Sequence, residues 1–177
     1  MSDERNENQL NTELLDAELP DPRFVDDRYL AWLYDENPDG PAIQAAADED
    51  GVRVAHYALV PQTYRNAAGP APFLFSLNAV TRRGTQRKGY WSELGLRVFA
   101  EATAQGRQMV IGVPNEKSTP GALKYLGYRF LGYTLNESRR PVFEYALIGD
   151  NAVVEDCRPV AGKRPGGDVE EQGAVPD

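Results

Sequence analysis

The middle of the chain alternates between helical and strand-like patterns of hydrophobic and polar residues. Apolar positions at helical spacing predict a helix that begins at Asp26 or Asp27 and ends near Asp35, where turn residues follow. Residues 42–48 and 52–60 have the pattern of two strands. The acidic, glycine-containing turn that joins them is typical of a β-hairpin.

The next two elements are a strand and a long helix. Residues 72–81 follow a loop at residues 66–70 and are apolar on both faces, which predicts a strand in the centre of a sheet. Helical spacing then predicts an amphipathic helix of about four turns that ends near Gly106. Its apolar positions are Trp91, Leu94, Val98, Phe99 and Ala102.

Shorter elements complete the pattern. Residues 109–113 predict a buried strand, and Thr119 caps a short helix that ends at Gly127. Residues 128–135 and 142–148 predict two last strands. We therefore expect one α/β domain, residues 26–150, whose sheet is of mixed direction and is flanked by helices.

The two ends of the chain differ from the middle. Acidic residues outnumber basic ones nine to two in residues 1–27 and seven to three in residues 150–177, so the middle is mildly basic although the net charge is −8. Prolines and a shortage of apolar residues predict an acidic disordered arm over residues 1–25 and a disordered tail over residues 151–177. The acidic total argues against nucleic acid as a partner, while the basic middle can accept a small phosphorylated ligand.

Composition excludes several kinds of site. Cys157 is the only cysteine and His56 the only histidine, which excludes an intrachain disulfide and a zinc site built from histidine and cysteine, so we expect no metal. The N-terminus lacks the pattern of a signal peptide, and no apolar run is long enough to span a bilayer. We therefore expect a cytoplasmic protein that does not contact membranes.

The stretch GTQRKGYW, residues 84–91, connects the central strand to the long helix. A glycine-containing turn at that place directs several backbone N–H groups at one point, where the helix dipole also favours negative charge. Gly89 permits close approach of a ligand, and Arg87 and Lys88 can neutralise phosphate charge. Taken alone, the stretch is better interpreted as a solvated basic turn, because such turns are common before helices.

The neighbouring residues give this stretch a family context. Gln86-Arg87-Lys88-Gly89-Tyr90-Trp91 resembles the Gln/Arg-x-x-Gly-x-Gly/Ala motif of the GNAT superfamily of N-acetyltransferases. Downstream, residues 113–115 and 118–128 look like the next strand, an asparagine that contacts the cofactor, and a short helix of that fold. Upstream, Trp32, residues 37–40 and residues 55–61 are similar to a GNAT subset associated with polysaccharide or secondary-metabolite biosynthesis.

This resemblance implies a mostly antiparallel sheet and acetyl-CoA, or another acyl-CoA, as co-substrate. Residues 86–91 would hold its pyrophosphate, and Asn115 would bind the pantetheine arm unless it only ties its own turn. Backbone N–H groups near Val80 and Thr81 would bind the thioester oxygen. A small-molecule amine would then attack the carbonyl directly. Two other hypotheses stay open: a degenerate domain that binds CoA or a protein partner without turnover, and a transferase that uses a longer acyl chain or an acyl carrier protein.

The sequence departs from the GNAT pattern at the expected proton carriers. Phe75 and Leu77 occupy strand positions where many members have a base, and Leu123 replaces the tyrosine that often acts as general acid. Tyr125 cannot substitute, because two residues turn a helical side chain by about 200°. His56 is a weak candidate for proton transfer, with a half-exposed strand residue and water-mediated catalysis as the alternatives.

Two further departures concern Trp91 and the start of the chain. Trp91 stands where the motif has Gly or Ala, so we expect its ring to point into the core while its backbone faces the phosphates. Residues 1–25 are too polar to supply the first strand and first helix of a complete GNAT fold, and the missing helix would normally help to form the acceptor site. An open sheet edge would favour pairing with another chain, which makes a homodimer possible.

Overall fold

The computed structural model describes residues 7–19, 21–66, 69–135 and 141–148. The elements in chain order are α1 (Glu7–Glu18), the 3₁₀ helix η1 (Pro22–Val25), α2 (Asp27–Tyr34), β1 (Ile43–Glu49), β2 (Val52–Asn66), β3 (Gly69–Thr81), α3 (Tyr90–Ala104), β4 (Met109–Gly112), α4 (Thr119–Tyr125), β5 (Arg129–Leu135) and β6 (Pro141–Ile148). From α2 onward this is the predicted order of helices and strands.

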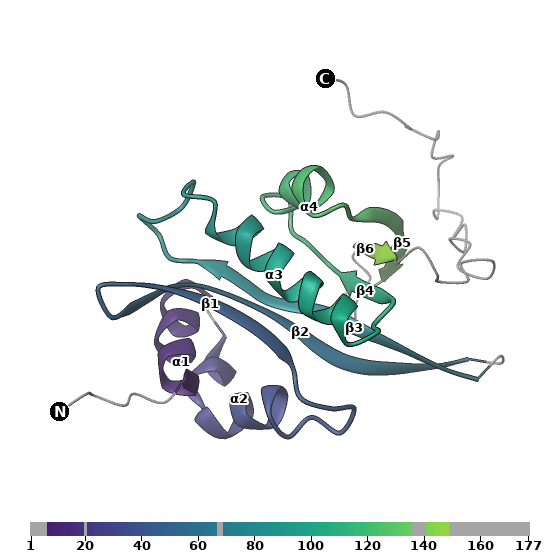
Figure 1. Cartoon of the computed structure of the whole chain (residues 1–177), viewed down its shortest axis with the longest axis horizontal. Helices are drawn as coiled ribbons and strands as arrows, with labels where there is room; N and C mark the ends of the chain where they lie inside the picture. Colours follow the sequence, from purple (N-terminus) through teal and green to yellow (C-terminus); the bar gives the residue numbers. More distant parts are fainter. Residues whose placement is uncertain (1–6, 20, 67–68, 136–140, 149–177) are drawn as a thin grey trace.

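The strands form one sheet in the order β1-β2-β3-β4-β6-β5 (Figure 1). Neighbouring strands are antiparallel except β3 and β4, which are parallel. The central position predicted for residues 72–81 is confirmed, because β3 lies between β2 and β4. The mixed, mostly antiparallel sheet flanked by helices also agrees with the predicted fold class.

Helices cover both faces of the sheet. α1 and α2 pack on one face of β2 and β3, and α3 packs on the other face of β1, β2 and β3 (Figure 1). The core on the α3 face contains Tyr57, Leu59, Leu74, Leu94, Val98 and Phe99. The core on the α1–α2 face contains Leu14, Leu15, Leu30, Tyr34, Ala58 and Val60. Because side chains alternate along a strand, β2 supplies both cores with successive residues.

The two hairpins follow from local chemistry. Asp50 (φ 51°) and Gly51 (φ 75°) both have positive φ in the β1–β2 turn, as the two central residues of a type I′ turn require. β2 and β3 extend beyond the prediction into the expected loop at residues 66–70, and pair as far as Asn66 and Gly69. Stacking of Tyr64 on Phe73, with ring centroids 4.3 Å apart, stabilises that extension.

The N-terminal segment corrects the sequence-based expectation. Residues 7–18 were expected to belong to a disordered arm, but they form α1, whose Leu14 and Leu15 are completely buried against α2. The prediction was wrong there because it rested on the low apolar content of the segment and not on the complete burial of Leu14 and Leu15. The first helix that the fold was expected to lack is therefore present. In the described residues the first strand is β1, which lies at a sheet edge. The predicted tail, 151–177, lies outside the described residues.

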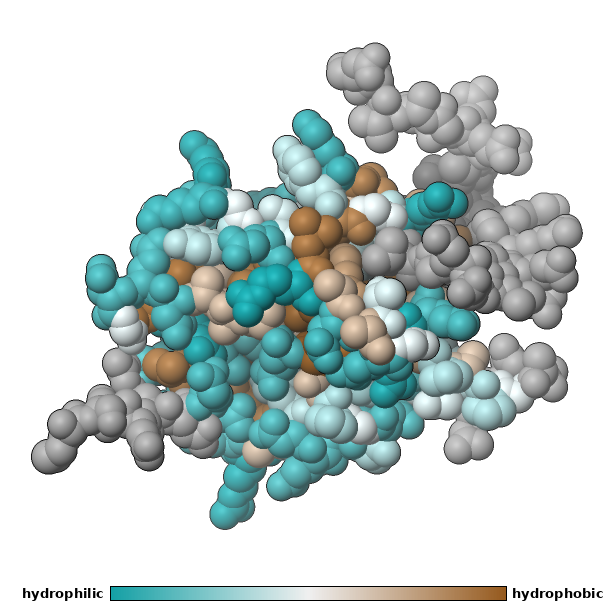
Figure 2. Space-filling model, viewed as in Figure 1, coloured by the Kyte–Doolittle hydropathy of each residue, from teal (hydrophilic) through white to brown (hydrophobic). Residues whose placement is uncertain are grey.

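The surface seen in Figure 2 is mostly hydrophilic, with hydrophobic side chains gathered around α3, α4 and β4. Exposed apolar residues in this region include Leu96, Val113 and Leu123. In the part of the chain that the structure describes, no helix has the length and apolar character that crossing a membrane requires.

Docking of α1 can be tested with Leu14→Ala. This change removes a completely buried side chain, so the free energy of unfolding should fall by about 2–5 kcal/mol. Leu96→Ala is the matched control because Leu96 is 55% exposed on α3, and it should change stability by less than about 0.5 kcal/mol. Urea denaturation followed by circular dichroism measures both. Equal stability of the two variants would show that α1 does not dock.

Candidate functional site

The sheet opens between its two parallel central strands. β3 and β4 pair at Leu74–Val110, Phe75–Ile111 and Ser76–Gly112. β4 then ends at Gly112, whereas β3 continues to Thr81. Residues 77–81 of β3 therefore have no β4 partner, and backbone groups on that side are available to a ligand.

A β-bulge lies next to this opening. Ala58 pairs with Leu77 and His56 with Val80, so β3 places two residues opposite the single residue Tyr57. One of these two, Asn78, has φ 52°, which is unusual for a residue other than glycine. Its side-chain amide donates to the Tyr34 hydroxyl at 2.7 Å, and its carbonyl lies 3.2 Å from His56 Nδ1. These contacts hold the bulge from the α1–α2 face.

The loop from β3 to α3 ends in an uncapped helix N-terminus. Gly84, Arg87 and Gly89 have φ values of 90°, 69° and 91°. Gly89 is the N-cap of α3, and no side chain caps the helix. The first N–H groups of a helix have no intrahelical acceptor, so these amides can bind an anion as the sequence predicts.

One of the positive charges of this loop is already paired with a carboxylate of the protein. Lys88 Nζ lies 2.8 Å from Glu49 Oε1, and the Tyr90 hydroxyl donates to the same carboxylate. Hydrogen bonds from Lys88 and then Tyr90 lower the pKa of Glu49. The loop is thereby attached to the β1–β2 turn. Arg87 is exposed and has no acidic partner among the described residues, so its charge is available to a ligand; Gln86 is also exposed.

Trp91 points into the protein, as predicted. Its ring is partly buried against the α3-face core, 5.9 Å from the ring of Tyr57. It also covers Gly121 of α4, where an added Cβ would lie 3.2 Å from the indole. Trp91 therefore joins the start of α3 to α4 and leaves its backbone N–H at the helix terminus.

Asn115 ties its own turn. Its Oδ1 accepts hydrogen bonds from the backbone N–H groups of Lys117 and Ser118 at 3.0 and 3.1 Å. This turn leads from β4 into α4. The sequence left two roles open for Asn115, a contact to the cofactor or a tie within its own turn, and the structure shows the second. The side-chain amide nitrogen makes none of these hydrogen bonds.

Buried hydroxyl groups line the α3 face of the opening. Thr81 pairs with Ala55 and Ser76 with Leu59, and paired residues share a sheet face, so both hydroxyls lie on the face of the α3 core. Within the part of the chain that the structure describes, Thr81 Oγ1 and Tyr128 Oη are buried and no hydrogen bond of standard geometry reaches either atom, although the hydroxyls of Ser76 and Tyr57 lie close enough to Tyr128 to affect its pKa. The position of Tyr128 beside β3 is decided by the fold and could not be predicted from the sequence.

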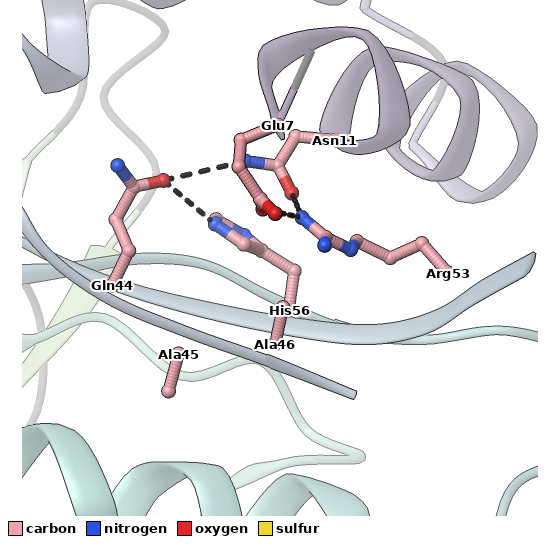
Figure 3. Close-up of a pocket in the computed structure, with 7 residues that line it drawn as sticks. All are labelled: Glu7, Asn11, Gln44, Ala45, Ala46, Arg53 and His56. Atoms are coloured by element: carbon pink, nitrogen blue, oxygen red, sulfur yellow. Dashed lines mark hydrogen bonds and ion pairs between the residues drawn. The ribbon is translucent and has the colours of Figure 1, made fainter. Parts of the chain in front are cut away.

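His56 lies on the opposite face, in a polar pocket beneath α1 (Figure 3). The pocket has a volume of about 200 Å³, and Glu7 and Asn11 extend into it from α1. The His56 ring is completely buried, with Nδ1 3.2 Å from the Asn78 carbonyl and Nε2 3.1 Å from Gln44 Oε1. It is thus not the half-exposed residue considered from the sequence. It supports the bulge, and it is not on the Thr81 face.

Arg53 organises the charges around His56. Its side chain is 3% exposed and contacts Glu7 at 2.8 Å, Asp48 at 2.9 Å and Asn11 Oδ1 at 2.6 Å. Burial opposes its charge, but hydrogen bonds to Asp48 and Glu7 raise the pKa of Arg53 overall. Burial, assisted by the Arg53 charge, lowers the pKa of His56 to about 4, against the favourable contact with the Asn78 carbonyl. The imidazole is therefore neutral at physiological pH.

Comparison with known proteins identifies the class of fold. No family model matches the chain, and no curated protein matches its sequence. Solved structures of acetyltransferases do match its fold. The chain thus has the same fold as solved GNAT-type acetyltransferases, as the resemblance implied.

Three solved structures illustrate the match. An aminoglycoside 6'-acetyltransferase type Ii has a TM-score of 0.61 and 16% identity, over 80% of this chain and 88% of that chain. A Bacillus subtilis acetyltransferase solved with CoA has a TM-score of 0.57 and 15% identity, over 81% and 94%. A Desulfovibrio desulfuricans protein assigned to the GNAT family has a TM-score of 0.61 and 12% identity, over 80% and 92%.

The depressed pKa of His56 predicts a pH dependence of stability. The unfolded chain binds this proton below its ordinary pKa of 6.5, whereas the folded chain resists it until about pH 4, so stability falls as the pH decreases through this window. The loss between pH 6.5 and about pH 5 should be about 2 kcal/mol. His56→Gln removes the titration and should flatten the curve, as measured by urea denaturation at each pH. Parallel curves for the two proteins would contradict the assignment.

Proposed function

We propose that this protein is an N-acyltransferase that transfers an acetyl group, or another acyl group, from acyl-CoA to the amine of a small molecule. The observation that carries the proposal is the end of the β3–β4 pairing at Gly112, together with the helix N-terminus at the start of α3, which no described side chain caps. This arrangement suits a long polar ligand with an anionic end.

The anionic end would lie at the start of α3. N–H groups of the first helical turn would bind the pyrophosphate, and Arg87 would add an uncommitted positive charge. A Cβ added at Gly89 meets no protein atom within 4 Å, so the space beside this backbone is open. Lys88 would contribute less than the sequence suggests, because Glu49 already neutralises it.

The reacting end would lie between β3 and β4. Acyl-CoA supplies an electrophilic carbonyl carbon and a thiol leaving group. Backbone N–H groups of β3 near Val80 would stabilise negative charge on the carbonyl oxygen, because the bulge at Asn78 redirects the backbone there and no β4 residue pairs with it. Phe75 and Leu77 offer no base on β3. Water would therefore take the proton of the attacking amine.

Charge near α1 and α2 favours a cationic acceptor. Residues 7–36 contain nine acidic and two basic residues, and this acidic surface covers the sheet face opposite α3. Three solved proteins of similar fold are aminoglycoside 6'-acetyltransferases. An amino sugar or a related polyamine is the acceptor class that this surface suits best.

Cofactor binding is tested by Gly89→Asp. A carboxylate at the start of α3 would repel the pyrophosphate, so the affinity for acetyl-CoA should fall by about 10- to 100-fold in calorimetric titration. Gly106→Asp is the matched control: Gly106 follows the other end of α3, also has positive φ (72°), and an added Cβ there also meets nothing. An equal effect of the two changes, or none from Gly89→Asp, would remove the loop from the binding site.

Turnover is tested with a panel of amines and acetyl-CoA. We expect release of free CoA above the blank with at least one amino sugar or polyamine, and a rate that falls as salt screens the acidic surface. Neutral and acidic amines provide the comparison. Binding of acetyl-CoA without turnover on any amine would support the degenerate, binding-only domain instead.

A further inference from the structure

One carboxylate lies beside the start of α3 and binds two side chains of the residues around it. Glu49 is the last residue of β1. Lys88 Nζ lies 2.8 Å and 3.0 Å from its two carboxylate oxygens, and the Tyr90 hydroxyl donates to Oε1. Lys88 and Tyr90 flank Gly89, the N-cap of α3. The Glu49 carboxylate is therefore about one side chain's length from the N–H groups that would bind the pyrophosphate.

Glu49 carries its negative charge at physiological pH. Hydrogen bonds from Lys88 and then Tyr90 lower the pKa of Glu49 below its ordinary value. The partial positive charge at a helix N-terminus also stabilises a nearby carboxylate. In the absence of a ligand, Glu49 thus occupies part of the electrostatic field that would attract a phosphate group.

A second carboxylate neutralises the other end of the loop. Glu18 Oε1 accepts a hydrogen bond from the Arg83 N–H at 2.9 Å, and Glu18 Oε2 lies 3.4 Å from Arg83 Nε. Of the three cations at positions 83, 87 and 88, only Arg87 has no acidic partner among the described residues. The basic appearance of the loop in the sequence therefore overstates the charge that it offers to an anion.

Lys88 is placed so that it can exchange partners. Its side chain is 51% exposed, and a lysine ammonium on its flexible stem reaches different acceptors without movement of the backbone. A Cβ added at Gly89 meets no protein atom within 4 Å, so space is open beside the neighbouring residue. What keeps Lys88 from this space is its contact with Glu49.

We propose that Glu49 limits the affinity for acyl-CoA by holding Lys88 away from the pyrophosphate. This inference rests on the proposed function. Glu49 is a positioning residue, because it acts through Lys88 and does not itself contact the ligand. Its own charge acts in the same direction, since it repels the phosphates across the short distance to the start of α3.

A limit on affinity suits a transferase. Acyl-CoA and the product CoA carry the same phosphates, so stronger binding of that end retains the product as firmly as the substrate. Interactions that are equal in the ground state and the transition state lower KM without raising kcat. Where product release limits turnover, they also lower kcat.

The test compares Glu49→Gln with Glu101→Gln in the full chain. Glu101 is an exposed carboxylate near the other end of α3, about 16 Å along the helix, which exceeds the screening length of about 10 Å at moderate salt. Glu49→Gln should lower the Kd for both acetyl-CoA and CoA by about 3- to 10-fold in calorimetric titration at low salt. Glu101→Gln changes the net charge equally and should match the wild type.

Two readouts separate this role from a structural one. The gain in affinity should shrink as salt is added, because it arises from charges. Inorganic pyrophosphate, which has only the anionic end, should compete with acetyl-CoA more strongly in Glu49→Gln by a similar factor. A loop that had only lost a structural contact would bind both ligands more weakly at every salt concentration. The melting temperature should stay within about 4 °C of the wild type, because an exposed ion pair contributes little to stability.

A double-mutant cycle tests whether the effect passes through Lys88. Lys88→Gln should weaken acetyl-CoA binding more in the Glu49→Gln protein than in the wild type, because Lys88 reaches the phosphates only after Glu49 releases it. An equal loss in the two proteins would show that Lys88 does not exchange partners and would overturn the inference.

The outcomes also separate this inference from the proposed function. If the wild type does not bind acetyl-CoA, the proposed function fails and this inference fails with it. If the wild type binds acetyl-CoA and Glu49→Gln binds it with equal or lower affinity, this inference alone is overturned, and Glu49 only attaches the loop to the β1–β2 turn. Tighter binding by Glu49→Gln, together with a larger loss from Lys88→Gln in that protein, supports it.

Discussion

The structure depends on where the pairing between β3 and β4 ends. β4 is short and stops at Gly112, because the chain must turn there through the Asn115 turn into α4, whereas β3 remains paired with β2 up to Thr81. A central strand thus has one paired side and one free side at the same residues. Backbone N–H and C=O groups are nearly always hydrogen-bonded, so those on the free side of β3 must bond to a ligand or to water. The glycine loop, the bulge and the buried hydroxyls are all arranged around this opening.

Side chains on the α1–α2 face of the sheet hold β3 in place beside the opening. Tyr34 of α2 and His56 of β2 contact Asn78 and hold its unusual backbone conformation. Gln44 and Asn11 connect His56 to Arg53, which is buried and binds carboxylates of α1 and β1 (Figure 3). Removing one partner from a buried charged network is expensive, so the network fixes α1 against the sheet. Support for the proposed oxyanion site therefore extends from β3 to the N-terminal helix.

Features that cost stability are concentrated at the opening. Asn78 and Arg87 have positive φ without being glycine, and the buried hydroxyl of Thr81 makes no hydrogen bond to the described residues. Asp50 also has positive φ, but it lies in a hairpin turn that requires it. Backbone strain and unsatisfied polar groups persist in folded proteins where function gives them a purpose, and they border one opening here. Their distribution supports the proposed site independently of any sequence motif.

Local patterns in the sequence determined α2, α3, the β1–β2 hairpin and the glycine-containing turn before Trp91, because periodicity, turn chemistry and capping act over a few neighbouring residues. The same patterns misjudged α1, since Leu14 and Leu15 stabilise a helix only by burial against α2 and β2, which lie far along the chain. The burial of His56 and the position of Tyr128 beside Ser76 and Gly112 were likewise decided by tertiary structure. Each depends on contacts between strands that are distant in sequence, and no local pattern contains that information.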